Sequence, residues 1–286
     1  MKIGIADAGG GMRGIYSAGI YDYCLDAGIG FDLCIGVSAG SGNLLRFLAG
    51  QDRVSRKFYF TYSFRKDYIS KRNILRHGCY VNLDYAYGTL VKEDGEAPLD
   101  YDALMANPAE YMAVATDIDT GEARYFTKDD LSRDHYEPLM ASSSIPLISR
   151  PVKIGGHRYY DGALADPVPV KKLFDEGCDL GIMVLTRPAD QLRQPGRDPL
   201  LADLIRHRFP RAAEALRARS DRYNEGVALA KKLEAEGKAL VLAPEDTFGV
   251  DTLTREIPPM VELYKAGYKD GRKIKAFLKK AGYKAI

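Results

Sequence analysis

Short runs of apolar residues alternate with segments of helical spacing along the first half of the chain. Residues 2–6 and 31–37 are apolar runs of strand length. Between them, residues 13–27 place apolar side chains near helical spacing and stop at Gly28, and residues 38–48 predict a second helix. Short buried strands that alternate with helices need cover on both faces of a sheet. The pattern therefore predicts an α/β fold, a three-layer α/β/α sandwich with a mainly parallel central sheet.

The second half of the chain changes from a mixed pattern to a mostly helical one. The further segments expected to form strands or helices are residues 111–116, 123–126, 180–185, 199–237, 238–242 and 259–280. The first two flank a turn at Asp119-Thr120-Gly121 and predict a hairpin. Composition changes near residues 187–197. We therefore expect a core domain over residues 1–186 and a mostly helical C-terminal extension over residues 187–286, packed on that core.

Composition and charge narrow the class of protein without naming a reaction. The 286 residues are 46% hydrophobic and 28% charged, as in ordinary globular proteins, and a net charge of +2 gives no reason to expect a nucleic-acid partner. The chain starts directly in a strand-like run, which leaves no room for a signal peptide, and no stretch reaches the roughly 18 apolar residues of a spanning helix. Its four scattered cysteines lack metal-ligand spacing. These features predict a cytoplasmic protein.

The pentapeptide Gly36-Val37-Ser38-Ala39-Gly40 matches Gly-x-Ser-x-Gly at a predicted junction between a strand and a helix. A nucleophilic serine needs a sharp, strained turn there, and small residues two positions before and after it keep the turn free of clashes. A helix that begins at Ser38 also directs N–H groups and its positive dipole end toward a reacting carbonyl oxygen. The alternative is a glycine-rich turn in which Ser38 only caps the helix.

The turn Gly9-Gly10-Gly11-Met12-Arg13-Gly14 is open to two functional interpretations. It contains the dinucleotide-binding fingerprint Gly-x-Gly-x-x-Gly, but the acidic residue that would hold a ribose after the second strand is absent. Alternatively, the glycines leave backbone N–H groups bare to approach a developing oxyanion, and Arg13 locks the loop or attracts an anionic head group. A tight turn without a ligand explains one or two glycines but not three.

An activated serine needs a base, and the histidines of this chain are poorly placed for that role. An α/β-hydrolase triad ends with a late histidine, but His207, the only late one, lies in a polar helical stretch. Asp161 is a better candidate, because Tyr159 and Tyr160 precede it and Gly162 follows it. The two rings can desolvate the carboxylate and raise its proton affinity toward that of a useful base. A single Asp-Gly pair is, however, usually just a turn.

Three motifs, in this order and spacing, resemble the signatures of patatin-like phospholipases. They are Gly-Gly-Gly-x-Arg-Gly at residues 9–14, Gly-x-Ser-x-Gly at 36–40 and Asp-Gly-Ala at 161–163. Residues 141–146, with Ser144 in place of the family's usual alanine, and residues 115–121 resemble two further family segments. The resemblance covers about residues 1–186, and the remainder is similar to the C-terminal extension of a bacterial subgroup.

The resemblance implies a catalytic pair of Ser38 and Asp161 without a histidine. It also implies an oxyanion hole formed by backbone N–H groups of Gly10, Gly11 and Ala39. The residues that complete the three motifs are Gly9, Arg13, Gly14, Gly36, Gly40, Gly162 and Ala163. Members of the family use phospholipids, lysophospholipids, neutral acylglycerols or small esters, so the substrate stays open.

We therefore expect a carboxylic ester hydrolase that acts on lipid esters through an acyl-enzyme and needs no metal or organic cofactor. Two other functions stay open at this point. One is a dinucleotide-binding oxidoreductase that uses the Gly9–Gly14 turn, and the other is a catalytically silent lipid-binding protein.

A basic segment at residues 53–76 suggests where a lipid substrate would come from. It holds eight Lys or Arg residues against one acid, Asp67, and six aromatic residues. The aromatic residues are Phe58, Tyr59, Phe60, Tyr62, Phe64 and Tyr68. This mixture suits peripheral contact with an anionic membrane at its inner face. It equally suits a helix with its rings in the core and its charges in solvent.

Overall fold

The structure is a computed structural model and describes residues 1–282. Within that range, eight strands form one sheet in the order β5-β6-β3-β2-β1-β7-β8, with β4 pairing to β3. The strands are β1 (Ile3–Asp7), β2 (Leu33–Val37), β3 (Glu110–Asp117), β4 (Ala123–Thr127), β5 (Val152–Ile154), β6 (His157–Asp161), β7 (Leu180–Val184) and β8 (Ala239–Leu242). The run β3-β2-β1-β7-β8 pairs in parallel, and β4 and β6 pair antiparallel to β3. The mainly parallel sheet and the hairpin β3–β4 are thereby confirmed.

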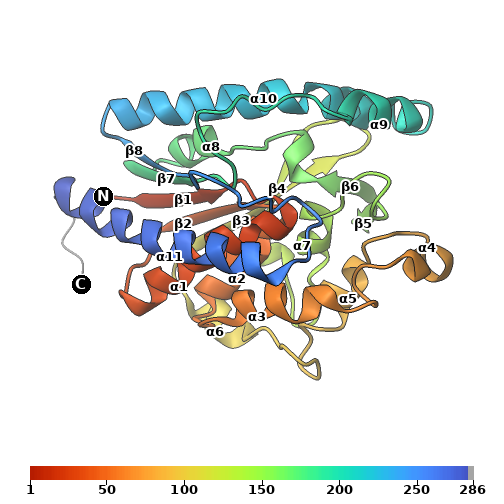
Figure 1. The fold of residues 1–286 in the computed structure, drawn as a ribbon, viewed down its shortest axis with the longest axis horizontal. Helices are drawn as coiled ribbons and strands as arrows, with labels where there is room; N and C mark the ends of the chain where they lie inside the picture. Colours follow the sequence, from red (N-terminus) through yellow and green to blue (C-terminus); the bar gives the residue numbers. More distant parts are fainter. Residues whose placement is uncertain (283–286) are drawn as a thin grey trace.

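Helices cover both faces of this sheet and complete three layers (Figure 1). The helices are α1 (Ile15–Asp26), α2 (Ala39–Leu48), α3 (Val54–Phe60), α4 (Lys71–His77), α5 (Leu83–Gly88), α6 (Tyr101–Ala106), α7 (Glu137–Ser142), α8 (Val170–Asp175), α9 (Asp198–Ile205), α10 (Pro210–Ala235) and α11 (Ile257–Lys280). Helices α1, α2 and α11 pack on one face, and α8 and α10 pack on the other. The expected sandwich is confirmed. Among the described helices, none is both long enough and apolar enough to cross a bilayer.

Side chains of the central strands alternate between the two helical layers, as the pleat of a strand requires. On β2, Leu33, Ile35 and Val37 pack on the side of α8 and α10, whereas Cys34 joins the core beside α1 and α2. All four positions are apolar because both faces of the strand are covered. That double burial is why β1 and β2 are continuous apolar runs in the sequence.

Two helical segments are more divided than the sequence pattern indicates. The helical stretch expected at residues 199–237 is two helices, α9 and α10, separated at residues 206–209. Pro210 is the first residue of α10, a position where the missing N–H of proline costs nothing, but it cannot continue a preceding helix. The basic segment at residues 53–76 is likewise divided between α3 and α4.

The region after residue 186 reaches both faces of the sheet. Strand β8 pairs in parallel with β7 at the edge, α10 crosses one face, and α11 lies along α1 on the other (Figure 1). The mostly helical character of this region is confirmed. A domain boundary at residue 186 stays a prediction, and residues 283–286 of the expected extension lie outside the described residues.

The carboxyl ends of β1, β2, β7 and β8 meet at one edge of the sheet because these strands are parallel. Chain order reverses at β1, which has β2 on one side and β7 on the other. Open parallel sheets bind ligands at such a point, outside the carboxyl ends of the strands. The fold therefore brings the turn after β1, Ser38 and the loops after β7 and β8 to one place.

Candidate active site

Ser38 occupies the sharp turn between β2 and α2 that the sequence predicted. Its φ is 55° and its ψ is −127°, a backbone region that residues with a side chain rarely adopt, so the turn is strained. The carbonyl of Ser38 accepts hydrogen bonds from the Ser41 N–H (3.0 Å) and the Ser41 hydroxyl (2.6 Å), which hold the turn. The side chain of Ser38 thus stands at the N-terminal end of α2 in a fixed orientation.

The register of the sheet brings Asp161 level with Ser38. Val37 pairs with Val114 across β2 and β3, so the next residue, Ser38, comes level with Ala115. Ala115 is in turn the antiparallel partner of Asp161 on β6. The two candidate residues are therefore separated by one strand, although 123 positions divide them in the chain. Strand β6 itself was not expected from the sequence.

The carboxyl group of Asp161 is buried and borders a cavity that Ser38 also lines. Burial raises the pKa of Asp161 to about 6, and hydrogen bonds from the Ala163 N–H (2.9 Å) and from the Ser38 side chain offset part of that rise. An aspartate in water has a pKa near 4. At neutral pH the carboxylate of Asp161 is therefore a better proton acceptor than the carboxylate of a solvent-exposed aspartate.

Residues 141–146 connect the two candidate residues. The Ser142 hydroxyl accepts a hydrogen bond from the N–H of Ser38 (2.9 Å). Two residues later, the carbonyl of Ser144 accepts one from the N–H of Asp161 (2.8 Å). The hydroxyl of Ser144 donates to the carbonyl of Arg150 (2.6 Å), so serine at this position adds a hydrogen bond that alanine could not make. This segment therefore holds Ser38 and Asp161 in place relative to each other.

The turn after β1 exposes bare backbone. Its three glycines all have positive φ, namely 63°, 130° and 60°. A Cβ on Gly10 would clash with the Thr186 hydroxyl, and one on Gly11 would clash with the carbonyl of Thr252. The three predicted oxyanion-hole residues are Gly10, Gly11 and Ala39. Within residues 1–282, their N–H groups have no hydrogen-bond acceptor. These groups are free to bind a negatively charged oxygen.

Asp7 is a site residue that the sequence analysis did not single out. It ends β1, is fully buried, and accepts hydrogen bonds from the Gly9 N–H (2.8 Å) and the Tyr21 hydroxyl (3.0 Å). Burial raises its pKa to about 6. The signal was present in the sequence as one charged residue at the end of an apolar strand, directly before the glycine turn.

The glycines of the three motifs are closely packed. Those at which a Cβ would come closer than 3 Å to a neighbouring atom are Gly9, Gly10, Gly11, Gly14, Gly36, Gly40 and Gly162.

Histidine is absent from the surroundings of Ser38. All four histidines are exposed, and none lines either of the two cavities that border Ser38. His207 lies in the connection between α9 and α10, where its ring accepts a hydrogen bond from Arg206 (3.3 Å). Within residues 1–282, no group of three or more His, Cys, Asp or Glu side chains is arranged to hold a metal ion.

The first of the two cavities is apolar and has a volume of about 100 Å³. It begins at Ser38 and is lined by α2, α3 and α5, with Phe58, Tyr59, Tyr62 and Tyr68 among its walls. Tyr59 and Tyr62 are almost fully buried. The basic segment suited either contact with a membrane or a helix with its rings in the core. For Tyr59 and Tyr62, the rings lie in the protein interior.

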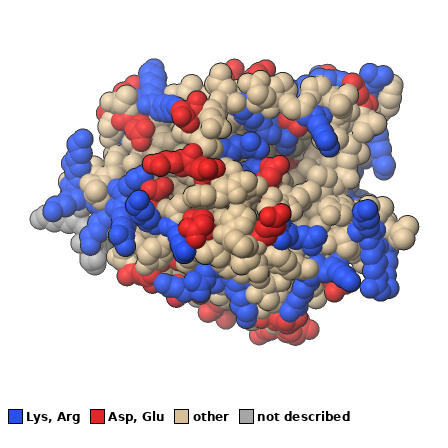
Figure 2. All heavy atoms as spheres, in the orientation of Figure 1, with Lys and Arg blue, Asp and Glu red and all other residues tan. Residues whose placement is uncertain are grey.

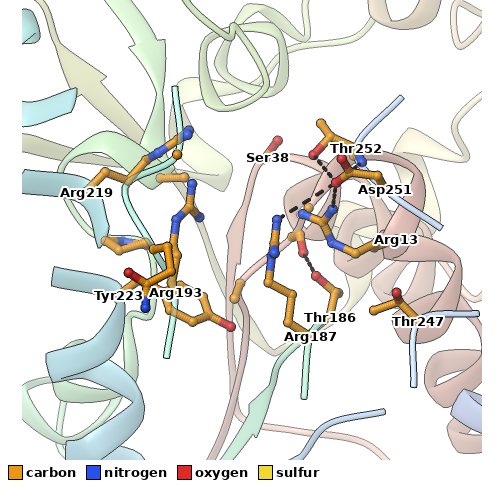
Figure 3. A pocket seen from close by; sticks show the side chains of 18 of the residues that line it. Arg13, Ser38, Thr186, Arg187, Arg193, Arg219, Tyr223, Thr247, Asp251 and Thr252 are labelled. Atoms are coloured by element: carbon orange, nitrogen blue, oxygen red, sulfur yellow. Dashed lines mark hydrogen bonds and ion pairs between the residues drawn. The ribbon is translucent and has the colours of Figure 1, made fainter. Parts of the chain in front are cut away.

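The second cavity is polar, has a volume of about 800 Å³, and shares Ser38 with the first. Its walls are the glycine turn, Asp161 and the loops after β7 and β8 (Figure 3). Arg13 is buried and forms an ion pair with Asp251, and the Met12 N–H donates to the carbonyl of Thr252 (3.0 Å). Thus Arg13 locks the glycine turn against the C-terminal region, one of the two roles expected of it.

Fold and site define a class: an α/β protein with a serine at a strand-to-helix elbow, beside a buried carboxyl group at the edge of a parallel sheet. Two family models match the chain, patatin-like phospholipase over residues 8–174 and a domain of unknown function (DUF6363) over residues 209–281. The first match spans more than half of the chain. The protein belongs to the patatin-like phospholipase family, as its three motifs predicted.

Two known proteins are similar to this chain. The uncharacterized protein YjjU of Escherichia coli (strain K12) is 28% identical over 207 residues, which cover 68% of this chain and 54% of that protein. This chain therefore spans about half the length of that relative. The crystal structure of VipD from Legionella pneumophila has a TM-score of 0.52 at 13% identity and covers 96% of this chain and 66% of that one. At this identity the likeness shows the fold alone.

Proposed function

We propose that the protein is a serine-dependent hydrolase of lipid esters, with Ser38 as nucleophile and Asp161 as general base. One observation carries the proposal. A serine on a strained elbow and a buried carboxyl group with a pKa raised to about 6 border the same cavity, with no histidine beside them. Membership of the patatin-like phospholipase family supports lipid acyl hydrolysis as the general activity.

The reaction that we propose runs in two balanced steps. Asp161 accepts the hydroxyl proton of Ser38 as the serine oxygen attacks the ester carbonyl, and the proton then passes to the departing alcohol. This leaves an acyl group on Ser38. A water molecule then attacks the acyl-enzyme and gives one proton to Asp161, which passes it to the oxygen of Ser38 as the fatty acid leaves. The original serine proton has left with the alcohol, and the water supplies the proton that restores Ser38.

The negative charge that develops on the carbonyl oxygen would be held by the free N–H groups of Gly10, Gly11 and Ala39. The turn is anchored on both sides, because the Gly9 carbonyl accepts from Thr186 and the Met12 N–H is bonded to the C-terminal region. Preorganised donors of this kind are worth on the order of 100- to 1,000-fold in turnover each. The apolar cavity that begins at Ser38 suits the acyl chain.

The two other functions considered for this chain receive less support. A dinucleotide-binding oxidoreductase would need a ribose site beyond the end of β2, where this chain has Ser38 and the start of α2. A silent lipid-binding protein would not need a serine on a strained elbow that shares a cavity with a buried carboxylate, because both features destabilise the fold. We therefore favour hydrolysis.

The experiment that tests the proposal is labelling with a fluorophosphonate, followed by mass spectrometry of the modified peptide. The reagent should modify Ser38, and Ser38→Ala should abolish both labelling and hydrolysis of a soluble ester. Because serine and alanine share the same Cβ, the variant adds no backbone strain at φ 55°. Ser132→Ala, an exposed serine away from both cavities, serves as the matched control. Modification of a different serine, or activity that survives in Ser38→Ala, would reject the assignment.

We further propose that α4 is the part of the basic segment that meets an anionic membrane. Leu75 is 90% exposed and Ile74 is 52% exposed, and the same helix carries three Lys or Arg residues. Exposed apolar tips among cations suit a lipid interface. Ile69 and Val81, which flank α4 and pair with each other, both line the apolar cavity. A lipid that enters beside α4 would therefore be close to the acyl site.

Charge reversal tests this docking surface. Arg72→Glu together with Arg76→Glu should weaken sedimentation with anionic vesicles, since each cation near such a surface contributes about 1 kcal/mol, and high salt should weaken the wild type in the same way. Hydrolysis of a short soluble ester should stay unchanged. Lys231→Glu with Lys232→Glu, on exposed positions of α10, is the control. If the Arg72→Glu/Arg76→Glu variant sedimented with vesicles as well as the wild type does, the proposed contact between α4 and the membrane would be rejected.

The cellular location that we propose is the cytoplasm, including the inner face of the membrane. The four cysteines are buried and form no disulfide, which fits a reducing compartment.

A further inference from the structure

Four arginines surround the polar cavity in an arrangement that acyl transfer does not require. Arg13 and Arg187 lie on one side and Arg193 and Arg219 on the other, with Ser38 above the gap between them (Figure 3). Three of the four come from the region after residue 186. The space-filling view shows basic atoms within a recess beside α10 (Figure 2). The C-terminal region therefore gives one wall of the cavity its charge.

On the α10 side of the cavity, two arginines share one buried carboxylate. Arg219 donates to both oxygens of Asp198, at 2.8 and 2.5 Å. Arg193 stays 3.6 Å from the same carboxylate. The backbone of Arg193 is fixed, because its N–H donates to the side chain of Asn224 (2.8 Å) and its carbonyl accepts from that side chain (3.0 Å). Arg193 is thus held in place by its backbone. Its guanidinium group makes no hydrogen bond to Asp198, because Arg219 is bonded to both oxygens of that carboxylate.

On the opposite side, two arginines lie near one carboxylate that is exposed. The carboxylate of Asp251, whose side chain is 75% exposed, forms an ion pair with Arg13, and the guanidinium of Arg187 lies 3.9 Å from it. Within residues 1–282, the guanidinium groups of Arg187 and Arg193 donate no hydrogen bond, and the Nε of Arg13 is buried without a partner. A guanidinium carries five N–H donors, and buried donors are normally satisfied, so the buried Nε of Arg13 is exceptional. The side chains of Arg187 and Arg193 are 40% and 16% exposed, so water can reach their donors from the cavity. The cavity is therefore lined from two sides by guanidinium donors that no protein acceptor occupies.

The charges around the two arginine pairs nearly balance. The four guanidinium groups face the carboxylates of Asp161, Asp198 and Asp251, which leaves an excess of one positive charge. Burial first, and then repulsion from Arg219 and Arg187, lower the pKa of Arg193 to about 10, against the opposing effect of Asp198. The other charged residues of the lining, apart from Asp161, are Arg197, Glu245 and Asp246. These three are exposed, where solvent screens their charge.

We propose that Arg187 and Arg193 form a subsite for the phosphate of a glycerophospholipid or lysophospholipid head group. The proposal rests on the acyl hydrolase function proposed above and names its substrate class. A tetrahedral phosphate presents oxygens in several directions and can be held from two sides by guanidinium forks, whereas the two oxygens of a carboxylate lie in one plane.

Connectivity of the substrate agrees with the arrangement of the two cavities. In a glycerophosphate lipid the ester and the phosphate are only a few bonds apart. With the phosphate between Arg187 and Arg193, the ester carbonyl can reach Ser38, where the polar and apolar cavities meet, and the acyl chain can extend into the apolar one. Neutral acylglycerols would fill the same sites but leave the arginines without an anion.

The test compares 1-acylglycerol 3-phosphate with 1-acylglycerol of the same chain length. The wild type should show a kcat/KM ratio of at least about 10 in favour of the phosphate, because hydrogen bonds to charged groups contribute about 1.5–3 kcal/mol and 1.4 kcal/mol is tenfold. Arg187→Gln combined with Arg193→Gln should bring the ratio close to 1, and the single variants should move it in the same direction. Arg211→Gln, an exposed arginine on α10, should keep the wild-type ratio. A ratio that the double variant leaves unchanged would overturn the proposal.

A binding arm separates the subsite from catalysis. Ser38→Ala protein is titrated calorimetrically with glycerol 3-phosphate and with inorganic phosphate. Tighter binding of glycerol 3-phosphate that is lost with the two arginines supports a head-group subsite. Equal binding of both ligands would indicate a site for free phosphate and overturn the head-group assignment, and binding of neither would overturn the subsite. If Ser38 were not labelled by fluorophosphonate and neither lipid were cleaved, the hydrolase proposal itself would fail, independently of these titrations.

Discussion

Two buried aspartates lie at the same edge of the sheet and differ in what surrounds them. Asp7 ends β1 and Asp161 ends β6, and burial raises the pKa of each to about 6. Both oxygens of Asp7 accept hydrogen bonds, from Gly9 and Tyr21, and Asp7 does not border either cavity at Ser38. Asp161 borders the polar cavity beside Ser38. A raised pKa therefore does not by itself indicate a general base, and access to Ser38, the proposed nucleophile, distinguishes Asp161 from Asp7.

The largest expected effect comes from Asp161→Asn. The amide cannot accept the serine proton, so kcat for a soluble ester should fall by about 1,000-fold, within the range seen when proton transfer is removed. His207→Ala should cost less than twofold, since His207 is exposed and remote from both cavities. Steady-state kinetics of the two variants decide the point. A loss in His207→Ala as large as that in Asp161→Asn would favour a triad.

The same variant should stabilise the protein at neutral pH. A carboxyl group with a folded-state pKa above its unfolded value binds its proton more tightly when folded, so its contribution to stability falls as pH rises from about 4 to about 6. Above that window the buried carboxylate of Asp161 costs up to about 3 kcal/mol. Asp161→Asn removes the charge, and Tm at pH 7.5 should rise by about 2–5 °C in thermal melts. A fall in Tm would show that the carboxylate stabilises the fold instead.

Asp7→Asn should have a smaller effect on activity and no stabilising effect. The amide oxygen can still accept from the Gly9 N–H, but the amide NH2 would then face the Tyr21 oxygen, and the hydroxyl proton of the buried Tyr21 would lose its acceptor, which offsets the gain from removing a buried charge. At Asp161 the corresponding hydroxyl, that of Ser38, borders a cavity where water can accept its proton. The glycine turn should shift, and kcat should fall about 10- to 100-fold. Because Asp161 is untouched, the dependence of kcat/KM on pH should keep its shape. A change in that shape would assign Asp7 a direct part in proton transfer.

Strands and motifs of the first half were predictable because local pattern encodes them. Buried parallel strands are continuous apolar runs, and a nucleophile elbow requires small residues at fixed spacing. Strand β6 was missed since its sequence, His157 to Asp161, is polar at one end and lacks alternation. The pairing of β6 with β3 therefore depends on tertiary context, and so does the proximity of Asp161 to Ser38.

The arginines of the polar cavity could not be predicted for a different reason. Arg13 meets Asp251 across 238 positions of the chain, and no local spacing marks either residue as a partner of the other. Arg187 and Arg193 lie in a segment that stood out only as a change in composition. The aromatic residues of the basic segment were recognised, but composition cannot tell whether Tyr59 and Tyr62 face solvent or a cavity.

The most direct test of the account is the pH dependence of kcat/KM for a soluble ester in the wild type and two variants. A base with a pKa of about 6 is protonated below that value, so the wild-type rate should rise through pH 6 and then level off. The rise should persist in His207→Ala and vanish from the residual activity of Asp161→Asn. A rise that persists in Asp161→Asn and vanishes in His207→Ala would contradict the Ser38–Asp161 pair.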